Sequence, residues 1–437
     1  MSDSPIYERP AALLQQLIRF DTTNPPGNEA ACVGYIDGLL RQAGIETTLL
    51  ALDPNRPNLI ARLPGRGEAP PLLLQGHVDV VTTAGQVWQQ PPFAANLVDG
   101  YIWGRGAVDM KGGVAMMVSA FLRAAAENLD TAGDLILAIV SDEESGGIYG
   151  AKFLAQQHPE QFAGVQYAIG EFGGFTMYVG GQRFYPIMVT EKQICSLKAT
   201  FHGPAGHGSR PLRGGAMAKL GHVLQQLDQH SLPPHLTPAA RQTIEAIAAA
   251  LPAPLNQFLA QLLQPAQIPA TLNALGDQAL FFVPMLHNTI SPTIVRGGDK
   301  INVIPAEVTL EMDGRLLPGF APDDIIGELR ALVGDVADIE VTRYDPGPPP
   351  PNMGWYETLA GVLREADPAG VPIPLMLTGV TDARHFAQLG IQTYGFLPMN
   401  LPPEFNFAQT IHAADERIPA GVLAFGTHCI YTALQRM

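Results

Sequence analysis

The chain has 437 residues, of which 46% are apolar, and its 41 acidic and 26 basic side chains leave a net charge of −15. A chain of this length is expected to form two or three domains, since domains average about 150 residues. The acidic balance, without any basic run, excludes nucleic acid and anionic membrane surfaces as partners, because both are bound through clustered positive charge.

The chain has an odd number of cysteines, and no two of them form a Cys-x-x-Cys pair. They are Cys32, Cys195 and Cys429. This argues against a disulfide framework and against a thiolate zinc site. No run of about 18 apolar residues is present, and the first residues lack the basic and apolar regions of a signal peptide. We therefore expect a cytoplasmic protein that makes no use of a membrane.

The first part of the chain alternates between helical and extended patterns. Apolar residues at helical spacing or in long runs predict helices in residues 10–20, 29–42, 112–126 and 147–157. Short apolar runs predict strands in residues 46–52, 59–63, 71–75, 97–103, 134–140 and 167–169. This alternation indicates an α/β domain in which a mixed sheet lies between helices.

A different order begins at about residue 192. The predicted elements are strand 195–202, helix 215–227, strands 289–296 and 306–315, helix 322–333 and strand 339–344. Their β-α-β-β-α-β order is typical of a ferredoxin-like domain, and the segment of about 230–287 is predicted to be a helical insertion in it. The first pattern returns after the prolines at 348–351, so residues 192–346 are predicted to form a small domain inserted between residues 1–191 and 347–437.

Polar residues that suit metal chemistry follow several predicted strands. His77 and Asp79 come directly after the strand at 71–75. Their spacing suits a metal-bound imidazole whose second nitrogen is held by a carboxylate. The alternative is an ordinary histidine at a strand end with Asp79 as a cap.

The glycine-rich loop from Trp103 to Gly113 is not a nucleotide site. Asp109 occupies the third glycine position of the G-x-G-x-x-G pattern, and a carboxylate at that point repels phosphate. We expect the loop instead to place Asp109 at the carboxyl edge of the sheet.

Glu143 and Glu144 follow the strand at 134–140, and Glu171 follows the strand at 167–169. His412, near the end of the chain, adds a second candidate histidine to His77. Adjacent carboxylates repel unless a cation or proton lies between them, so one can bind a metal while the other moves protons. The alternative is a solvated acidic loop that opens a helix. Recurrence at one sheet edge predicts an oxygen and imidazole site that suits zinc, cobalt or manganese.

These motifs occur together in one order along the chain. They are Gly76-His77-Val-Asp79, Gly106-Ala-Val-Asp109-Met-Lys-Gly-Gly113, Asp142-Glu143-Glu144-Ser-Gly-Gly147, Gly170-Glu171, Gly206-His207-Gly-Ser-Arg-Pro211, Asn302-Val-Ile-Pro305, Thr381-Asp-Ala-Arg384 and Ile411-His412-Ala-Ala-Asp-Glu416. From about Pro10 to the C-terminus, the chain resembles the di-zinc peptidase and deacylase family of acetylornithine deacetylase, succinyl-diaminopimelate desuccinylase, aminoacylase and glutamate carboxypeptidase.

The resemblance implies a zinc-peptidase-like catalytic domain, an inserted ferredoxin-like lid and dimerisation domain, and two Zn²⁺ per subunit, with Co²⁺ or Mn²⁺ as substitutes. Asp109 and a hydroxide would bridge the two metals, and the Asp109–Met110 peptide would be cis. Glu143 would be the general base, and Asp79 would orient His77. One metal would be completed by His77 and Glu171, and the other by Glu144 and His412.

The same resemblance implies contacts with substrate. His207 would reach the neighbouring subunit's site in a homodimer and polarise the scissile carbonyl, and the alternative is a turn histidine on a glycine-rich surface loop. Asn302 and Arg315 would engage a substrate carboxylate, and Arg315 has the alternative of pairing with Asp313 or Glu311. Thr378, Gly379 and Arg384 would line the pocket, and the alternative for Arg384 is that it only caps local structure. The long 230–287 segment departs from the compact deacetylases and puts their lid contact in doubt.

The resulting hypothesis is a metal-dependent hydrolase that cleaves the amide bond of an N-acyl amino acid or short peptide. One alternative is a dipeptidase or carboxypeptidase rather than a deacylase, because pocket walls decide between them. The other is a catalytically silent metal-binding assembly protein, which would have no need of Glu143 or of a complete ligand set.

Overall fold

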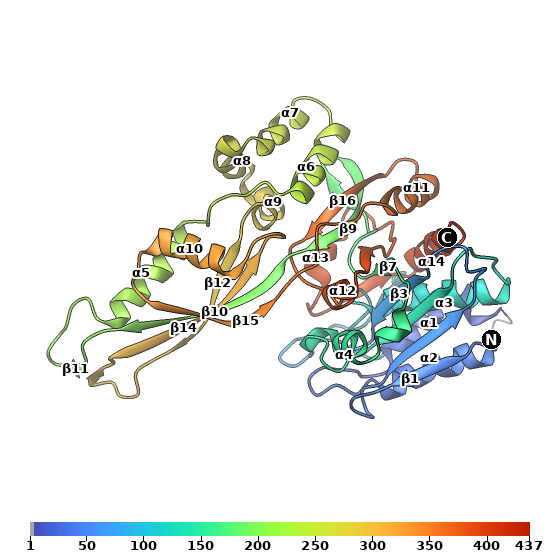
Figure 1. Ribbon diagram of the computed structural model, residues 1–437, viewed down its shortest axis with the longest axis horizontal. Helices are drawn as coiled ribbons and strands as arrows, with labels where there is room; N and C mark the ends of the chain where they lie inside the picture. The colour runs from blue at the N-terminus through green and yellow to red at the C-terminus, as the bar shows by residue number, and fades with distance from the viewer. Residues whose placement is uncertain (1–3) are drawn as a thin grey trace. The chain divides into compact units, whose positions relative to one another are not determined.

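A computed structural model describes residues 4–437, which divide into two compact units (Figure 1). The first unit contains the described residues up to Val189 together with Pro351–Leu375 and Thr381–Met437, and the second contains Thr190–Pro350 and Met376–Val380. No helix among the described residues has the length and apolar character that spanning a membrane requires.

The first unit is built on a mixed nine-stranded sheet in the order β1-β2-β6-β3-β7-β17-β9-β16, with β8 beside β9. Its central strands β6, β3, β7 and β17 run parallel. The strands are β1 (Thr47–Leu50), β2 (Asn58–Leu63), β3 (Leu72–His77), β6 (Leu135–Val140), β7 (Tyr167–Gly170), β8 (Met177–Val179), β9 (Gln182–Glu191), β16 (Val371–Leu377) and β17 (Gln392–Gly395). A smaller sheet joins β4 (Leu97–Val98), β5 (Tyr101–Trp103) and β18 (Arg417–Pro419).

Helices cover both faces of the large sheet, which explains why β6 is apolar at every position and completely buried. Leu72 and Leu74 face one core and Leu73 faces the other, as strand alternation requires. The first core contains α1 (Pro10–Ile18), α2 (Ala30–Gln42), α3 (Lys111–Ala126), α11 (Tyr356–Ala366) and α14 (Val422–Leu434). The second core contains α4 (Ala151–Gln157) and Phe386 of α12 (Ala383–Ala387). A short helix, α13 (Phe407–Thr410), precedes His412.

The second unit has an antiparallel sheet in the order β12-β14-β10-β15, which is the ferredoxin-like arrangement that the sequence predicts. Its elements are β10 (Gln193–His202), α5 (Ala216–Gln229), β12 (Thr289–Arg296), β14 (Glu307–Leu316), α10 (Pro322–Val333) and β15 (Asp338–Asp345). Alternate residues of β14 are buried, and one face of the sheet packs with α5 and α10 around Cys195. The fold class predicted from the sequence is confirmed.

The segment between α5 and β12 contains four helices: α6 (Pro238–Ala250), α7 (Leu255–Leu259), α8 (Ile268–Leu275) and α9 (Ala279–Leu286). Thr237 begins α6 by accepting a hydrogen bond from the Ala240 amide, with a proline at the first helical position. Short 3-10 turns occupy Ile6–Glu8, Glu143–Ser145, Pro159–Phe162, Ala260–Leu263, Pro265–Gln267 and Gly276–Gln278.

Three local features differ from the sequence predictions. The single strand predicted in residues 97–103 is a hairpin, β4 and β5, that turns at Asp99 and Gly100, both with positive φ. The helix predicted from residue 147 begins at Ala151, after Gly146 and Gly147 adopt left-handed backbone. The two-stranded antiparallel sheet of β11 (Gly206–His207) and β13 (Val303–Ile304) has no counterpart among the predicted elements.

Candidate active site

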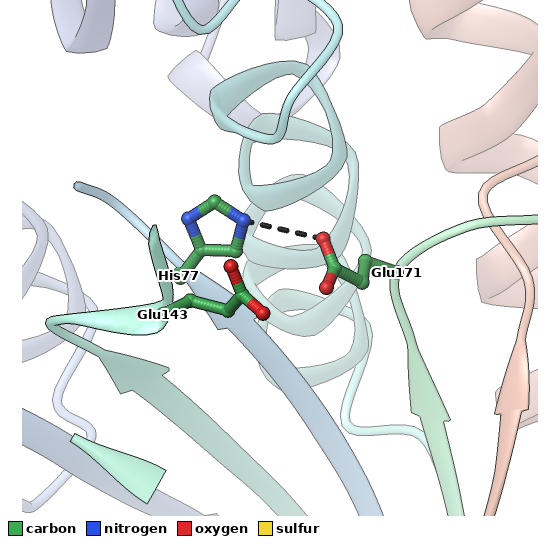
Figure 2. A group of neighbouring side chains, drawn as sticks. All are labelled: His77, Glu143 and Glu171. Carbon is green, nitrogen blue, oxygen red and sulfur yellow. Dashed lines mark hydrogen bonds and ion pairs between the residues drawn. The ribbon is translucent and has the colours of Figure 1, made fainter. Parts of the chain in front are cut away.

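Three parallel strands carry acidic and imidazole side chains to one edge of the large sheet. His77 is the last residue of β3, Glu143 follows β6, and Glu171 follows β7. Because the carboxyl ends of neighbouring parallel strands meet at one edge, the three side chains converge. Figure 2 shows them pointing toward one another, with the His77 ring 3.2 Å from Glu171 Oε2.

Asp109 lies between the two imidazoles. His77 Nε2 is 3.2 Å from Asp109 Oδ1, and His412 Nε2 is 3.2 Å from Asp109 Oδ2. His412 Nε2 is also 3.2 Å from Glu144 Oε2. Each carboxylate oxygen of Asp109 thus faces a different imidazole, the arrangement expected of a carboxylate shared by two metal ions. The Asp109–Met110 peptide is cis, as the resemblance implies.

The side chains form two groups with metal-ligand spacing. One group is His77, Glu143 and Glu171, and the other is Asp109, Glu144 and His412, with the ligand atoms of each group within 4.8 Å of one another. Glu144 Oε1 is buried and has no hydrogen-bond partner. A buried, unpartnered carboxylate oxygen in a set of carboxylates and imidazoles fits a cation of the zinc type.

Asp79 holds more than the His77 ring. Its Oδ1 lies 3.4 Å from His77 Nδ1, which is also 3.0 Å from the Asp79 carbonyl oxygen. The same carboxylate accepts hydrogen bonds from the backbone amides of Glu143 and Glu144, both at 3.1 Å. The side-chain amide of Asn24 donates to it as well, at 2.8 Å. Asp79 therefore fixes the loop that carries both glutamates.

The electrostatics of the site demand positive charge. Burial, followed by the charge of Glu171, raises the pKa of Glu143 well above its usual range. Burial and the charge of Asp109 raise the pKa of Glu144 to about 7. Hydrogen bonds with Asp109 and Glu144 raise the pKa of His412 to about 10. Carboxylates that resist ionisation beside imidazoles that retain protons are expected of a site that binds cations.

Arg384 is a buried cation next to the proposed base. Its Nη1 lies 3.8 Å from Glu143 Oε1, and it also donates to the Thr381 carbonyl at 2.7 Å. The sequence suggests Arg384 only as a pocket-lining residue or a local cap. Asn24 is missed altogether at sequence level, because its Asn-Pro-Pro-Gly context indicates no more than a turn.

Apart from Arg384, the residues expected to touch substrate lie in the second unit. His207 is exposed on β11, with its Nδ1 2.8 Å from Ser209 Oγ. The carbonyl oxygen of Asn302 accepts a hydrogen bond from the Gly208 amide at 2.8 Å. Arg315 donates from Nε and Nη2 to Asp313, at 2.8 and 3.1 Å, which is the pairing considered as its alternative role. Thr378 and Gly379 follow β16.

Known proteins are similar to this chain in sequence and in fold. The N-fatty-acyl-amino acid synthase/hydrolase of Bos taurus is 27% identical over 80% of this chain and 70% of its own. Aminoacylase-1 of Sus scrofa is 25% identical over 97% of this chain and 93% of its own. A solved M20 family metallo-carboxypeptidase from Sulfolobus solfataricus has the same fold, with a TM-score of 0.71 at 15% identity over 100% of this chain and 99% of that chain.

A family model extends across most of the chain. The model described as Peptidase family M20/M25/M40 matches residues 73–436, which include His77, Asp109, Glu143, Glu144, Glu171 and His412. The match and the geometry agree on a metal-dependent hydrolase. The chain therefore belongs to peptidase family M20/M25/M40.

Proposed function

We propose that the chain hydrolyses the amide bond of an N-acyl amino acid or a short peptide with a free carboxylate, using two Zn²⁺ per subunit. The observation that carries this proposal is the place of Asp109, which presents one oxygen to His77 and the other to His412. The names of the two relatives, an aminoacylase and an N-fatty-acyl-amino acid synthase/hydrolase, support an N-acyl amino acid as the substrate.

The distances from the two imidazoles to the neighbouring carboxylates support one ligand set. His77, Asp109 and Glu171 would hold one zinc ion, and Asp109, Glu144 and His412 would hold the other, with Co²⁺ or Mn²⁺ as substitutes. When bound, the metals supply Lewis acidity that makes water a stronger nucleophile near neutral pH and balance negative charge in the transition state.

Glu143 would move the proton. It takes a proton from the attacking water as the water oxygen bonds to the amide carbon, and then delivers that proton to the nitrogen as the carbon–nitrogen bond breaks. The products are a carboxylic acid and an amine, and proton transfer between them gives a carboxylate and an ammonium ion. Glu143 lies in one group with His77 and Glu171, within reach of a water held beside them, and this position supports its assignment as the base. Asp79 would keep both His77 and the Glu143 amide in place.

The second unit would supply substrate contacts. His207 would polarise the scissile carbonyl in the neighbouring subunit's site, while Asn302 and Arg315 bind the substrate carboxylate beside Thr378 and Gly379. Arg315 supports this role because its planar guanidinium is suited to carboxylates, and a substrate would compete with Asp313 for it.

A homodimer would form through the second unit. β12 is an edge of the four-stranded sheet, and its Ile294 and Val295 side chains are 41% and 52% exposed. An open strand edge with exposed apolar side chains favours pairing with another chain. The three cysteines are free and buried, which supports a cytoplasmic, reducing location.

The experiment is a substrate screen. Protein purified with Zn²⁺, Co²⁺ or Mn²⁺ is incubated with N-acyl amino acids and with dipeptides, and Glu143→Ala serves as the inactive control. We expect the wild type to release amino acids and Glu143→Ala to lose about 10²–10⁴-fold in kcat while still binding two metals. Preference for dipeptides would identify a peptidase instead of a deacylase. A wild type that binds two metals but hydrolyses nothing would leave only a silent metal-binding protein.

A further inference from the structure

A buried ion pair outside the ligand set joins the two loops that carry Asp109 and His412. Arg105 Nη1 donates to Glu416 Oε2 at 2.6 Å, and the two side chains are 1% and 0% exposed. The residues are 311 positions apart in the sequence, so the pair is a tertiary contact. A buried charge pair is retained only where other hydrogen bonds satisfy its remaining atoms.

Glu416 satisfies its remaining atoms on the loop that ends at Asp109. Its Oε1 accepts hydrogen bonds from the backbone amides of Val108 and Asp109, at 2.8 and 3.2 Å. Its Oε2 accepts one from the Gly106 amide at 3.1 Å. The carboxylate therefore clamps the main chain of residues 106–109 and sets the position from which Asp109 extends.

Arg105 continues the network to His412. Its Nη2 donates to the His412 carbonyl oxygen at 3.2 Å and to Gln86 Oε1 at 2.8 Å. Gln86 Nε2 donates to the same carbonyl at 2.9 Å. The His412 backbone has a φ of 60°, in the left-handed region, and its side chain is 49% exposed. These donors to the His412 carbonyl hold a strained backbone whose side chain has little packing around it.

We propose that Arg105 and Glu416 are positioning residues that hold the loops of Asp109 and His412 in fixed positions relative to each other. In this way they bring Asp109 and His412 together with Glu144 as one metal-binding group. This inference rests on the proposed function, because it assigns the pair a role through the metal ligands. Neither residue contacts the reacting atoms. Outer partners of metal ligands typically change metal affinity about 10–100-fold when they are replaced.

Glu416→Gln tests the clamp with little change in volume. Both oxygens of Glu416 accept N–H groups, so whichever way a glutamine amide turns, its NH₂ faces at least one backbone N–H donor. Arg105→Lys tests the link to His412 with charge retained. The single nitrogen of a lysine ammonium group cannot replace the two guanidinium nitrogens of Arg105, of which one donates to Glu416 and the other to the His412 carbonyl.

The chain offers a matched control in the same unit. Arg62 pairs with Asp134 at 2.8 Å, and Asp134 also accepts the Gly65 amide at 2.9 Å. This pair likewise combines an arginine, a carboxylate and a loop amide, but it holds no loop that carries a proposed ligand. Asp134→Asn and Arg62→Lys are therefore the controls for Glu416→Gln and Arg105→Lys.

The measurement is a Zn²⁺ titration of each metal-free protein, with near-UV circular dichroism and the thermal unfolding midpoint of the metal-free form alongside. We expect Glu416→Gln and Arg105→Lys to bind at least one of the two metals about 10–100-fold less tightly than the wild type, while the controls keep wild-type affinity. Should Glu416→Gln fail to fold, Arg105→Lys alone decides the question, because it keeps a cation beside Glu416.

The inference is overturned if the folded variants bind both metals with wild-type affinity, whatever happens to their unfolding midpoints, because a purely structural pair alters stability and not affinity. A wild-type protein that binds no metal would instead refute the proposed function, and that result is visible before any variant is made.

Discussion

Asp79 shows how much one buried carboxylate determines at this site. It contacts the His77 ring and accepts hydrogen bonds from the amides of Glu143 and Glu144, so a single side chain holds two proposed metal ligands and the proposed base. The spacing of His77 and Asp79 predicts the first contact, because a carboxylate two positions from a strand-end histidine reaches its ring. The contacts to the amides of Glu143 and Glu144 depend on the path of the loop that follows β6. No local sequence pattern predicts that path.

Lys192 is a second buried group, with a consequence for stability. Its ammonium group is fully buried and donates to the His287 carbonyl and to Thr289 Oγ1, at 2.8 and 3.0 Å. Burial, with the charge of Arg315, lowers the pKa of Lys192 to about 7. In the unfolded chain a lysine keeps its proton up to a pKa of about 10.4.

This difference fixes the sign of a pH effect. Between about pH 7 and 10 the unfolded chain binds more protons at Lys192 than the folded chain, so this group makes the protein more stable as pH rises. We expect the urea midpoint of the wild type to rise from pH 7 to pH 9 relative to that of Lys192→Met, whose methionine has no charge. Equal shifts in the two proteins would contradict the assignment.

At the scale of elements, the parallel strands β3, β6 and β7 place the site. Their apolar runs predict the α/β class. The polar residues at their carboxyl ends predict that His77, Glu143 and Glu171 converge at one edge of the sheet. Strand β9 is not predictable in the same way, because Pro186 interrupts its pattern. The Arg105–Glu416 contact is equally invisible in sequence, since its partners lie in loops at opposite ends of the unit's chain.

Close packing behind the Glu143 loop gives a test at this scale. A Cβ added to Gly150 would lie 1.7 Å from the Ser141 carbonyl oxygen, whereas one added to Gly38, in α2, has no neighbour within 4 Å. We expect Gly150→Ala to destabilise the protein by about 1–3 kcal/mol and to lower activity, because the loop after β6 must shift. Gly38→Ala is the control and should be neutral or slightly stabilising. Equal urea midpoints for the two variants would show that the loop gives way without cost.

At the scale of the whole molecule, part of the net charge of −15 belongs to one site. Five carboxylates gather there, from Asp79, Asp109, Glu143, Glu144 and Glu171, and two divalent cations would offset most of their charge. The acidic balance that argues against nucleic acid as a partner thus also explains why the protein needs metal. The substrate's anionic end would then be met by Arg315 or by the metals.

The proposed dimer is tested on the edge strand. Ile294→Lys places a charge on β12, where it would be buried by a second copy, and should convert the dimer to a monomer in sedimentation velocity. Leu49→Lys is the matched control, because Leu49 is 46% exposed on β1, an edge strand of the other sheet. A wild type that already sediments as a monomer would refute both the dimer and any role of His207 in a neighbouring subunit.

The sharing of Asp109 between two metal ions is tested most directly by counting bound metal. Wild-type protein and Asp109→Ala are loaded with Zn²⁺, freed of excess metal, and measured by elemental analysis per chain, with circular dichroism confirming that both are folded. Because Asp109 faces both His77 and His412, we predict two zinc ions in the wild type and loss of tight binding at both groups in Asp109→Ala. Two tightly bound zinc ions in folded Asp109→Ala would contradict the shared carboxylate.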